Sequence, residues 1–142
     1  MTLTLQDALK ITDGAFQASN DQKAAPLTIA ILDTGGRLIS LQRQDGASMM
    51  RPDIAIAKAW GALAMGCSSR TLATTAEQRP AFMSAVTSLA EGNILPVPGG
   101  VLIKDHQQQL IGAVGISGDL SEIDEQCAIL GIETANLLTD AI

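Results

Sequence analysis

The spacing of apolar residues predicts five helical segments. Apolar positions recur every three or four residues across 5–16, and Thr4 with Asp7 forms a capping-box pattern in front of them. Ser121 and Asp124 repeat this pattern near the end of the chain. Two prolines, which suit the first turn of a helix, mark further helix starts. The expected helices cover residues 5–22, 53–66, 68–76 and 80–89, and a last one begins at Ser121 with an apolar stripe that continues through Leu137 to Ala141.

Two pairs of short apolar runs predict β-hairpins. Residues 27–32 are apolar on both faces, as in a central strand, and the glycine-containing turn 33–36 lets the chain return as 37–43. A second hairpin joins residues 101–104 to 109–117. The order of helices and hairpins lacks the strand–helix alternation of a parallel doubly wound sheet. It predicts an α+β fold, with helices flanking an antiparallel sheet, as one domain of 142 residues.

Charge and hydropathy narrow the class of partner. Lys and Arg total 9 against 15 Asp and Glu, a net charge of −6, whereas nucleic-acid binding relies on basic side chains that neutralise phosphates. No apolar run approaches the ~20 residues of a membrane span, and the start of the chain lacks the basic and apolar regions of a signal peptide. We therefore expect a cytoplasmic protein with no nucleic-acid or membrane partner.

Lys58 interrupts an otherwise apolar part of the predicted helix 53–66. Burying an ammonium group is costly unless it is paired, so Lys58 requires a carboxylate, a carbonyl or an anionic ligand. Charged residues, among them Asp45 and Arg51, surround the loop that enters this helix. They form either exposed ion pairs of small energetic effect or an electropositive entrance where free amides at the helix start hold a carboxylate.

Residues 95–119 contain two β-type runs that are interrupted by glycines. Glycine weakens a strand unless another group approaches its backbone, here a packed helix, a neighbouring subunit or a ligand. Close packing is the better explanation for Gly112 and Gly115. The glycine spacing fits neither the phosphate loop nor the G-x-G-x-x-G motif, which excludes nucleotide binding by these standard motifs.

The turn at Pro98, Gly99 and Gly100 is a candidate for ligand contact. Proline donates no hydrogen bond, and two adjacent glycines are expected to leave backbone amides exposed for an anion or a carbonyl. Ser117 and Gly118 stand just before the last helix. We expect these five residues to line one side of the site.

Asp124 and Glu125 are adjacent, and neighbours on a helix point about 100° apart, so they cannot act as a paired acid and base on one substrate. Their structural role is to stabilise the positive end of the last helix, and Glu125 is the better functional candidate if a pocket adjoins it. His106 is expected to be a solvated residue of the second hairpin turn. Cys67 and Cys127, in predicted helices without C-x-x-C spacing, are expected to be buried thiols, and no metal site or Ser-His-Asp triad is predicted.

Together, several segments resemble the GlcG/HbpS family, which is also called heme-degrading-protein-like and forms the C-terminal domain of PduO-type proteins. The resemblance spans about residues 3–138. It implies a profilin-like or PAS-like antiparallel sheet with helices on its faces, and assembly into homo-oligomers. The segments that carry it are IAILDTGG (29–36), RQDGA (43–47), AKA (57–59), QRPAF (78–82), PGGV (98–101), IGAVGISG (111–118) and the pair Asp124-Glu125.

Some members of this family bind heme, so the resemblance implies heme as a candidate cofactor. A heme iron would need an axial ligand, and the only histidine is poorly placed for one. The sulfur-containing alternatives are Met49, Met50, Met65, Cys67 and Cys127.

Three functions remain open at this point. The first is a cytoplasmic, homo-oligomeric protein that binds heme or another anionic organic molecule. The second is a catabolic hydratase or tautomerase for an unsaturated organic acid, in which Lys58 or Arg51 holds the carboxylate and Glu125 or Asp45 moves the proton. The third is a structural oligomer with glycines at subunit contacts and Lys58 in a salt bridge between subunits. The residues expected to bind the ligand are Arg51, Lys58, Pro98, Gly99, Gly100, Ser117, Gly118 and Glu125.

Overall fold

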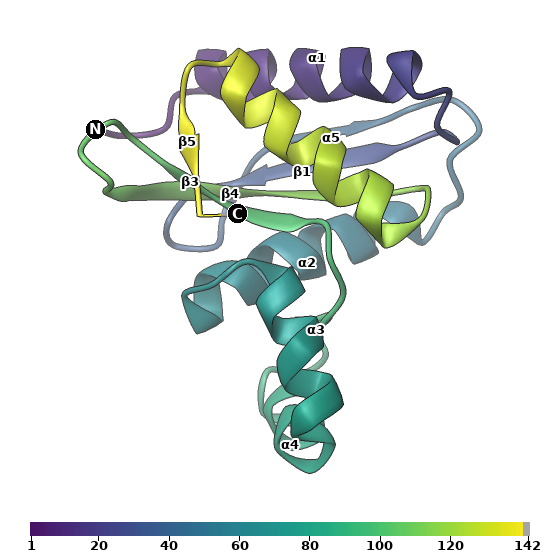
Figure 1. Ribbon diagram of the computed structural model, residues 1–142, viewed down its shortest axis with the longest axis vertical. Helices are drawn as coiled ribbons and strands as arrows, with labels where there is room; N and C mark the ends of the chain where they lie inside the picture. Colours follow the sequence, from purple (N-terminus) through teal and green to yellow (C-terminus); the bar gives the residue numbers. More distant parts are fainter. Residues whose placement is uncertain (141–142) are drawn as a thin grey trace.

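An antiparallel sheet of five strands forms the centre of the computed structural model, which describes residues 1–140 (Figure 1). Its strand order is β2-β1-β4-β3-β5. The strands are β1 (Thr28–Leu32), β2 (Leu38–Arg43), β3 (Gly100–Lys104), β4 (Leu110–Ser117) and β5 (Leu138–Thr139). The helices are α1 (Leu5–Asp21), α2 (Arg51–Met65), α3 (Ser69–Gln78), α4 (Pro80–Leu89) and α5 (Ser121–Thr134). The predicted α+β architecture, an antiparallel sheet flanked by helices, is confirmed.

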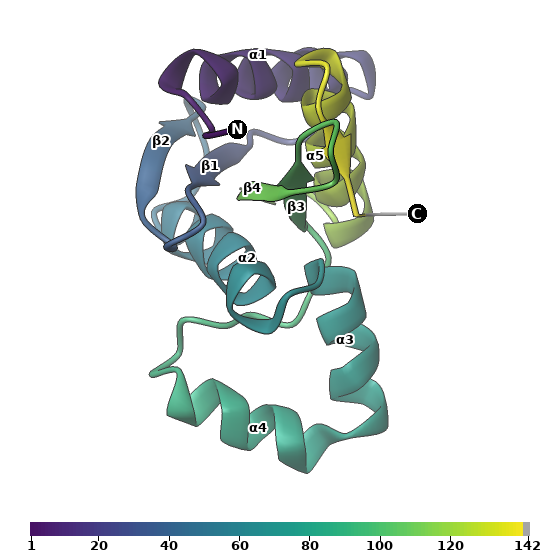
Figure 2. The ribbon, with the colours of Figure 1, turned by 90° about the vertical axis from the view of Figure 1, so that its left-hand side faces the viewer.

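Helices cover both faces of the sheet (Figure 2). Helices α1 and α5 pack together on one face, and α2 lies across the other. Successive residues of a strand point to opposite faces. Ile29 and Ile31 therefore join the core beneath α1 and α5, while Leu32 packs with Ala59 and Ala62 of α2. Within residues 1–140 no helix is long and apolar enough to cross a membrane.

Two glycines of the sheet set how closely α2 approaches it. Gly100 and Gly115 pair across β3 and β4. A Cβ atom at Gly115 would lie 1.9 Å from the carbonyl oxygen of Ala55, and one at Gly100 would lie 2.2 Å from that of Lys58. The packing explanation for Gly115 is therefore confirmed, with α2 as the packed element.

The two predicted capping boxes have different outcomes. At α1 the box is formed: the Thr4 hydroxyl accepts the Asp7 N–H, and the Asp7 carboxylate accepts the Thr4 N–H. At α5 the prediction is wrong, because Leu120 is the N-cap residue and Ser121 is already helical. The Asp124 carboxylate accepts the Asp119 N–H and points into the protein.

The chain leaves α5 earlier than the sequence pattern predicts. Asn136 adopts a φ of 60°, a left-handed conformation that ends the helix and that asparagine tolerates better than most residues. Residues Leu138 and Thr139 then form β5 beside β3. The expectation that the helical stripe continues through Leu137 is wrong, and Ala141 lies outside the described residues.

Helices α3 and α4 project from the body of the protein below α2 (Figures 1 and 2). We call these two helices the arm. A small cluster formed by Leu72, Met83 and Ile94 holds it together, with Trp60 of α2 at its base.

Candidate functional site

Most of the candidate ligand-binding residues lie near one end of the sheet. Thr28 pairs with Arg43 on one side and with Ser117 on the other, so the end of β2, the start of β1 and the end of β4 lie next to one another. The Ile116 N–H donates to the Gly99 carbonyl, which joins the start of β3 to the same end. We call this region the 117 end of the sheet.

Lys58 of α2 is buried next to the 117 end of the sheet. Its residue exposure is 2%, and its ammonium donates to the Ile116 carbonyl at 2.8 Å and to Asp124 Oδ2 at 3.1 Å. Two of the three predicted kinds of partner, a carbonyl and a carboxylate, are therefore present. The ion pair forms within one chain, so the idea that Lys58 bridges two subunits is wrong.

Burial dominates the acid–base behaviour of this pair. Loss of hydration lowers the pKa of Lys58, and the carboxylate of Asp124 partly offsets that effect. The same loss of hydration raises the pKa of Asp124, against the opposing effects of Lys58 and the Asp119 N–H. The nearby guanidinium of Arg51 further lowers the pKa of Lys58.

Arg51 is half-buried at the first position of α2, and its Nη1 donates to the Ser117 hydroxyl at 3.0 Å. None of the three ion pairs formed by residues 1–140 includes this guanidinium. Helix α2 has no side-chain hydrogen bond at its N-cap. Beside Ser117, the buried Thr28 hydroxyl also has no hydrogen-bond partner among the described residues. One guanidinium without a carboxylate partner in the described chain, that of Arg51, thus lies at the 117 end beside the hydroxyls of Ser117 and Thr28.

The Pro98–Gly100 turn packs closely against Lys58. All three residues are buried, and the Gly100 N–H donates to the Ser69 hydroxyl at 2.7 Å. Gly99 has a φ of 126°, and a Cβ there would lie 2.7 Å from the Lys58 ammonium nitrogen. The amide of Gly100 is therefore already occupied, contrary to the expectation that it is free for a ligand.

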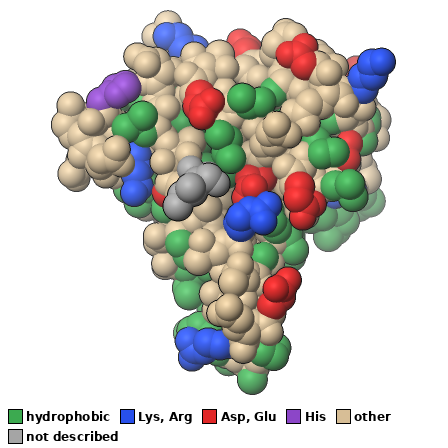
Figure 3. All heavy atoms as spheres, viewed as in Figure 1, with side chains coloured by type: hydrophobic (Ala, Val, Ile, Leu, Met, Phe, Trp, Pro, Cys, Tyr) green, Lys and Arg blue, Asp and Glu red, His purple; other side chains and the backbone are tan. Residues whose placement is uncertain are grey.

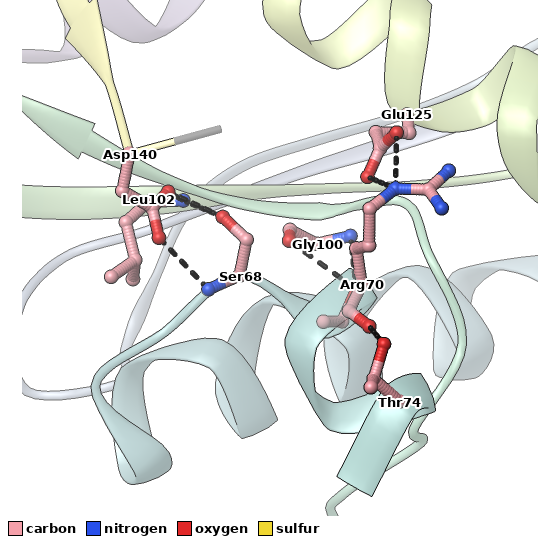
Figure 4. A network of polar contacts seen from close by, with 8 residues as sticks. Ser68, Arg70, Thr74, Gly100, Leu102, Glu125 and Asp140 are labelled. Carbon is pink, nitrogen blue, oxygen red and sulfur yellow. Dashed lines mark hydrogen bonds and ion pairs between the residues drawn. The ribbon is translucent and has the colours of Figure 1, made fainter. Parts of the chain in front are cut away.

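Glu125 and Asp124 diverge, as expected for neighbours on a helix. The Nε–H of Arg70 on α3 is shared between the two carboxylate oxygens of Glu125, with N···O distances of 2.9 and 3.0 Å (Figure 4). Asp45 is exposed at a surface depression of about 490 Å³, which Arg43 and Pro26 also line. The proton-transfer candidates and Lys58 therefore do not converge on one cavity in this conformation.

Gly118 faces the chain instead of open space. A Cβ there would lie 2.2 Å from the Pro26 carbonyl oxygen. This close approach brings the segment before β1 against the segment before α5, where the Ala25 N–H donates to the Asp119 carboxylate at 2.7 Å. Gly118 thereby shapes the 117 end through packing.

The sulfur- and nitrogen-containing residues are spread over the molecule. His106 is exposed in the turn between β3 and β4, as predicted, and its Nε2 lies 2.8 Å from the Asn136 carbonyl oxygen. Cys127 is buried, which raises the pKa of its thiol to about 11. The expectation that Cys67 is a buried thiol in a helix is wrong, because it is half-buried and lies at the joint between α2 and α3, outside any helix. Among residues 1–140 no group of three or more potential ligands could hold a metal ion.

A second polar network was not apparent from the sequence. Asp140, just after β5, accepts hydrogen bonds from the backbone N–H and hydroxyl of Ser68 and from the Leu102 N–H (Figure 4). It ties the end of the chain to the start of α3 and to β3. Its signal is weak in the sequence because 72 positions separate Ser68 from Asp140.

The fold is that of an α+β protein with an antiparallel sheet covered by helices on both faces. Residues 3–133 match the family described as haem degrading protein HbpS-like, and the chain belongs to that family.

Curated relatives come from two kinds of protein. A corrinoid adenosyltransferase PduO of Citrobacter freundii is 29% identical over 98% of this chain, but the match covers only 41% of that protein. An uncharacterized 15.0 kDa protein from the dhaT-dhaS intergenic region of the same organism is 29% identical over 89% of this chain and 87% of its own length.

Two solved structures share the fold over almost the whole chain. A PduOC complex with heme has a TM-score of 0.88 at 25% identity and covers 99% of this chain and 100% of its own. The HbpS crystal structure has a TM-score of 0.80 at 25% identity, with 94% and 89% of the two chains covered. These matches confirm the family and the fold expected from the sequence.

Proposed function

We propose that this protein binds heme, or another small molecule that carries carboxylates, at the 117 end of the sheet, and that it acts as a cytoplasmic homo-oligomer. The observation that carries the proposal is the likeness of the whole chain to a solved heme complex, at a TM-score of 0.88. The half-buried guanidinium of Arg51, outside the ion pairs of the described chain, supports the location.

The residues at the 117 end fit the chemistry of heme. Arginine is well suited to hold a carboxylate such as a propionate, because its planar fork matches both oxygens. Met49 and Met50 immediately precede Arg51, and they are 83% and 56% exposed. Their side chains offer apolar contact area and a thioether, which is a known axial ligand of heme iron. Bound heme would supply an iron centre for electron transfer or for binding a further ligand.

The other candidate axial ligands are poorly placed for the same site. His106 precedes β4 whereas Ser117 ends it, and seven residues of strand span about 23 Å. Met65 lies at the opposite end of α2 from Arg51, about 21 Å along the helix axis, and Cys67 lies two residues beyond Met65. Cys127 is buried. Met49 and Met50 are therefore the proposed ligands, with Arg51 holding a propionate.

Lys58 and Asp124 act as positioning residues in this proposal. Their ion pair fixes the last residue before Ser117 through the Ile116 carbonyl, and it joins α2 to the start of α5. Gly99 and Gly100 give this pair and α2 the room that they need. Arg51 and Ser117 are thus held on a rigid support, which reduces the ordering required when a ligand binds.

Titration of the purified protein with hemin tests the proposal. A saturable Soret shift is expected, and Arg51→Met should weaken binding at least about tenfold because a charge-assisted hydrogen bond is lost. Arg37→Met, which removes an exposed arginine at the other end of the sheet, is the matched control and should leave the affinity unchanged.

Two further experiments distinguish binding through the heme iron from binding through the carboxylates. Met49→Leu combined with Met50→Leu should change the position of the Soret band while hemin still binds. Short organic acids, followed by calorimetry, test the wider form of the proposal. If neither hemin nor any organic acid binds, or if Arg51→Met and Arg37→Met behave alike, the assignment of this site is wrong.

A further inference from the structure

Helix α4 presents an apolar surface that the described chain leaves uncovered. From Pro80 to Leu89 the helix contains no charged residue, and Met83 is its only buried residue. Phe82, Ala85 and Leu89 are spaced by three and four positions, which places them on one face. Phe82 is 38% exposed and Leu89 is 85% exposed. Figure 3 shows hydrophobic side chains gathered at the end of the arm.

The inner face of α4 packs against the rest of the arm, and the outer face takes no part in that packing. Met83 packs with Leu72 and Ile94 in the cluster that holds the arm, and Val86 and Ala90 adjoin it. A helix of ten residues is marginal alone, and its stability depends on the apolar area that it buries. Covering the outer face would therefore stabilise the arm as well as remove apolar surface from water.

Charges stand at the two ends of this uncharged surface in a self-complementary arrangement. Arg79 precedes the helix and Glu91 follows it, each six positions from Ala85. If two copies of α4 lie antiparallel with their Ala85 residues opposite each other, the helix end that bears Arg79 in each copy lies beside the end that bears Glu91 in the other. Arg79 already lies over the Phe82 ring, 4.1 Å from its centroid, and so borders the apolar face.

We propose that α4 is a self-association surface whose partner is the α4 of a second copy of this chain, antiparallel about a two-fold axis near Ala85. Two-fold contacts use the same patch on both subunits, and this patch is complementary to itself in charge and apolar along its centre. A chain with a net charge of −6 repels its own copies over most of its surface, so an uncharged patch favours contact. The inference rests on the homo-oligomer proposed above and identifies one of its interfaces.

Sedimentation velocity across a range of protein concentrations tests this surface. Because a pair of short helices buries less area than a standard interface, we expect association by α4 alone to be weak and concentration-dependent. Leu89→Glu should weaken it at least about tenfold, because two carboxylates would enter an apolar contact. Leu5→Glu is the control, since it adds the same charge at a residue on α1 that is 57% exposed.

A charge exchange tests the antiparallel register directly. Arg79→Glu alone and Glu91→Arg alone should each weaken association about fivefold, because like charges then face each other. The double variant should recover the original affinity within about twofold. Arg79→Glu also removes the contact of Arg79 with the Phe82 ring. Glu91→Arg cannot restore that contact, so recovery in the double variant would report on the charges between the two copies.

The outcomes separate this inference from the proposed function. If the wild type associates and Leu89→Glu associates equally well, α4 is not the interface, although the homo-oligomer stands. If the wild type is a monomer at every concentration, both are wrong, while hemin titration still tests the ligand site. If the monomer instead sediments with phosphatidylcholine–phosphatidylglycerol vesicles and Leu89→Glu does not, the patch is a lipid contact and the second copy is the wrong partner.

Discussion

Two ion pairs that begin at neighbouring residues of α5 have opposite surroundings. Asp124 pairs with Lys58 where the side chains are 1% and 3% exposed, whereas Glu125, whose side chain is 13% exposed, pairs with Arg70, whose side chain is 52% exposed and leaves the pair open to solvent. The buried pair also binds the end of β4 through the Ile116 carbonyl. The exposed pair only links α5 to the first turn of the arm.

This difference shows why the type of residue alone does not indicate its role. A buried charge without its partner is costly, because the protein interior cannot replace lost hydration. An exposed charge loses little when its partner is removed, because water and salt replace the interaction. Removing the charge of Asp124, whose role is harder to recognise from the sequence, should therefore destabilise the protein more than removing the charge of Glu125.

Breaking the buried pair should give the largest loss of stability. Asp124→Asn leaves the Lys58 ammonium buried without a carboxylate, and we expect the free energy of unfolding to fall by about 3–5 kcal/mol. Urea unfolding followed by circular dichroism measures this. The double variant Lys58→Met with Asp124→Leu should recover most of the loss, since it removes both charges together. A loss below about 1 kcal/mol in Asp124→Asn would contradict the role given to this pair.

The next effect tests the backbone packing that brings Lys58 to its place. Gly115→Ala puts a Cβ 1.9 Å from the Ala55 carbonyl oxygen, so α2 must move away from the sheet. We expect a loss of about 1–3 kcal/mol in the free energy of unfolding, as for other overpacked cores. Gly35→Ala is the control, because its Cβ would lie no closer than 3.4 Å to another group. Similar stabilities for the two variants would mean that α2 adjusts without cost.

A third carboxylate, Asp105, is 1% exposed yet has the opposite pKa shift from Asp124. The N–H groups of Gln109 and Gln107 donate to it, and these bonds lower its pKa below the ordinary value of 3.8. Because its folded-state pKa is lowered, Asp105 contributes stability above about pH 4 that is lost as the pH falls through the folded-state value.

We therefore expect the destabilisation caused by Asp105→Asn to be largest at neutral pH and to shrink as the pH falls from about 5 to about 2. Urea unfolding of the wild type and the variant at several pH values gives this difference directly. Asp13→Asn changes an exposed carboxylate on α1 and should show a much weaker trend. A difference for Asp105→Asn that stays constant with pH would show that the backbone bonds do not favour the charged form.

Local patterns were sufficient to predict most of the fold. The capping box at Thr4 and the turn glycine Gly36, with a φ of 76°, act within a few residues, so the sequence alone reveals their effects. The packing role of Gly115 followed because a strand glycine needs a reason to be there. Helix α4 begins at Pro80 and ends at Leu89, as the sequence predicted.

Long-range contacts account for what the sequence did not reveal. The need of Lys58 for a partner was evident, but its partner is 66 positions away and resembled a capping residue of α5. The short strand β5 continues the apolar pattern of α5, so only its pairing with β3 distinguishes it from helix. The Gly100 amide was expected to be free because the hydroxyl of Ser69, 31 positions away, was not visible as its partner.

The smallest expected effect completes the comparison between the two ion pairs. Glu125→Gln removes the charge that pairs with Arg70, and we expect a loss of only about 0.2–1 kcal/mol in the free energy of unfolding, smaller still at high salt. Chemical denaturation of Glu125→Gln, Arg70→Met and the double variant gives the coupling between the two side chains. Because Glu125 contacts Arg70 of the arm, whereas Arg51 donates to Ser117 at the 117 end, the affinity for hemin should be unchanged in Glu125→Gln. The coupling between Glu125 and Arg70 should be much smaller than that between Asp124 and Lys58. If the two couplings were equal, burial would not explain how strongly these carboxylates stabilise the protein, and the contact of α5 with the arm would be the more important factor.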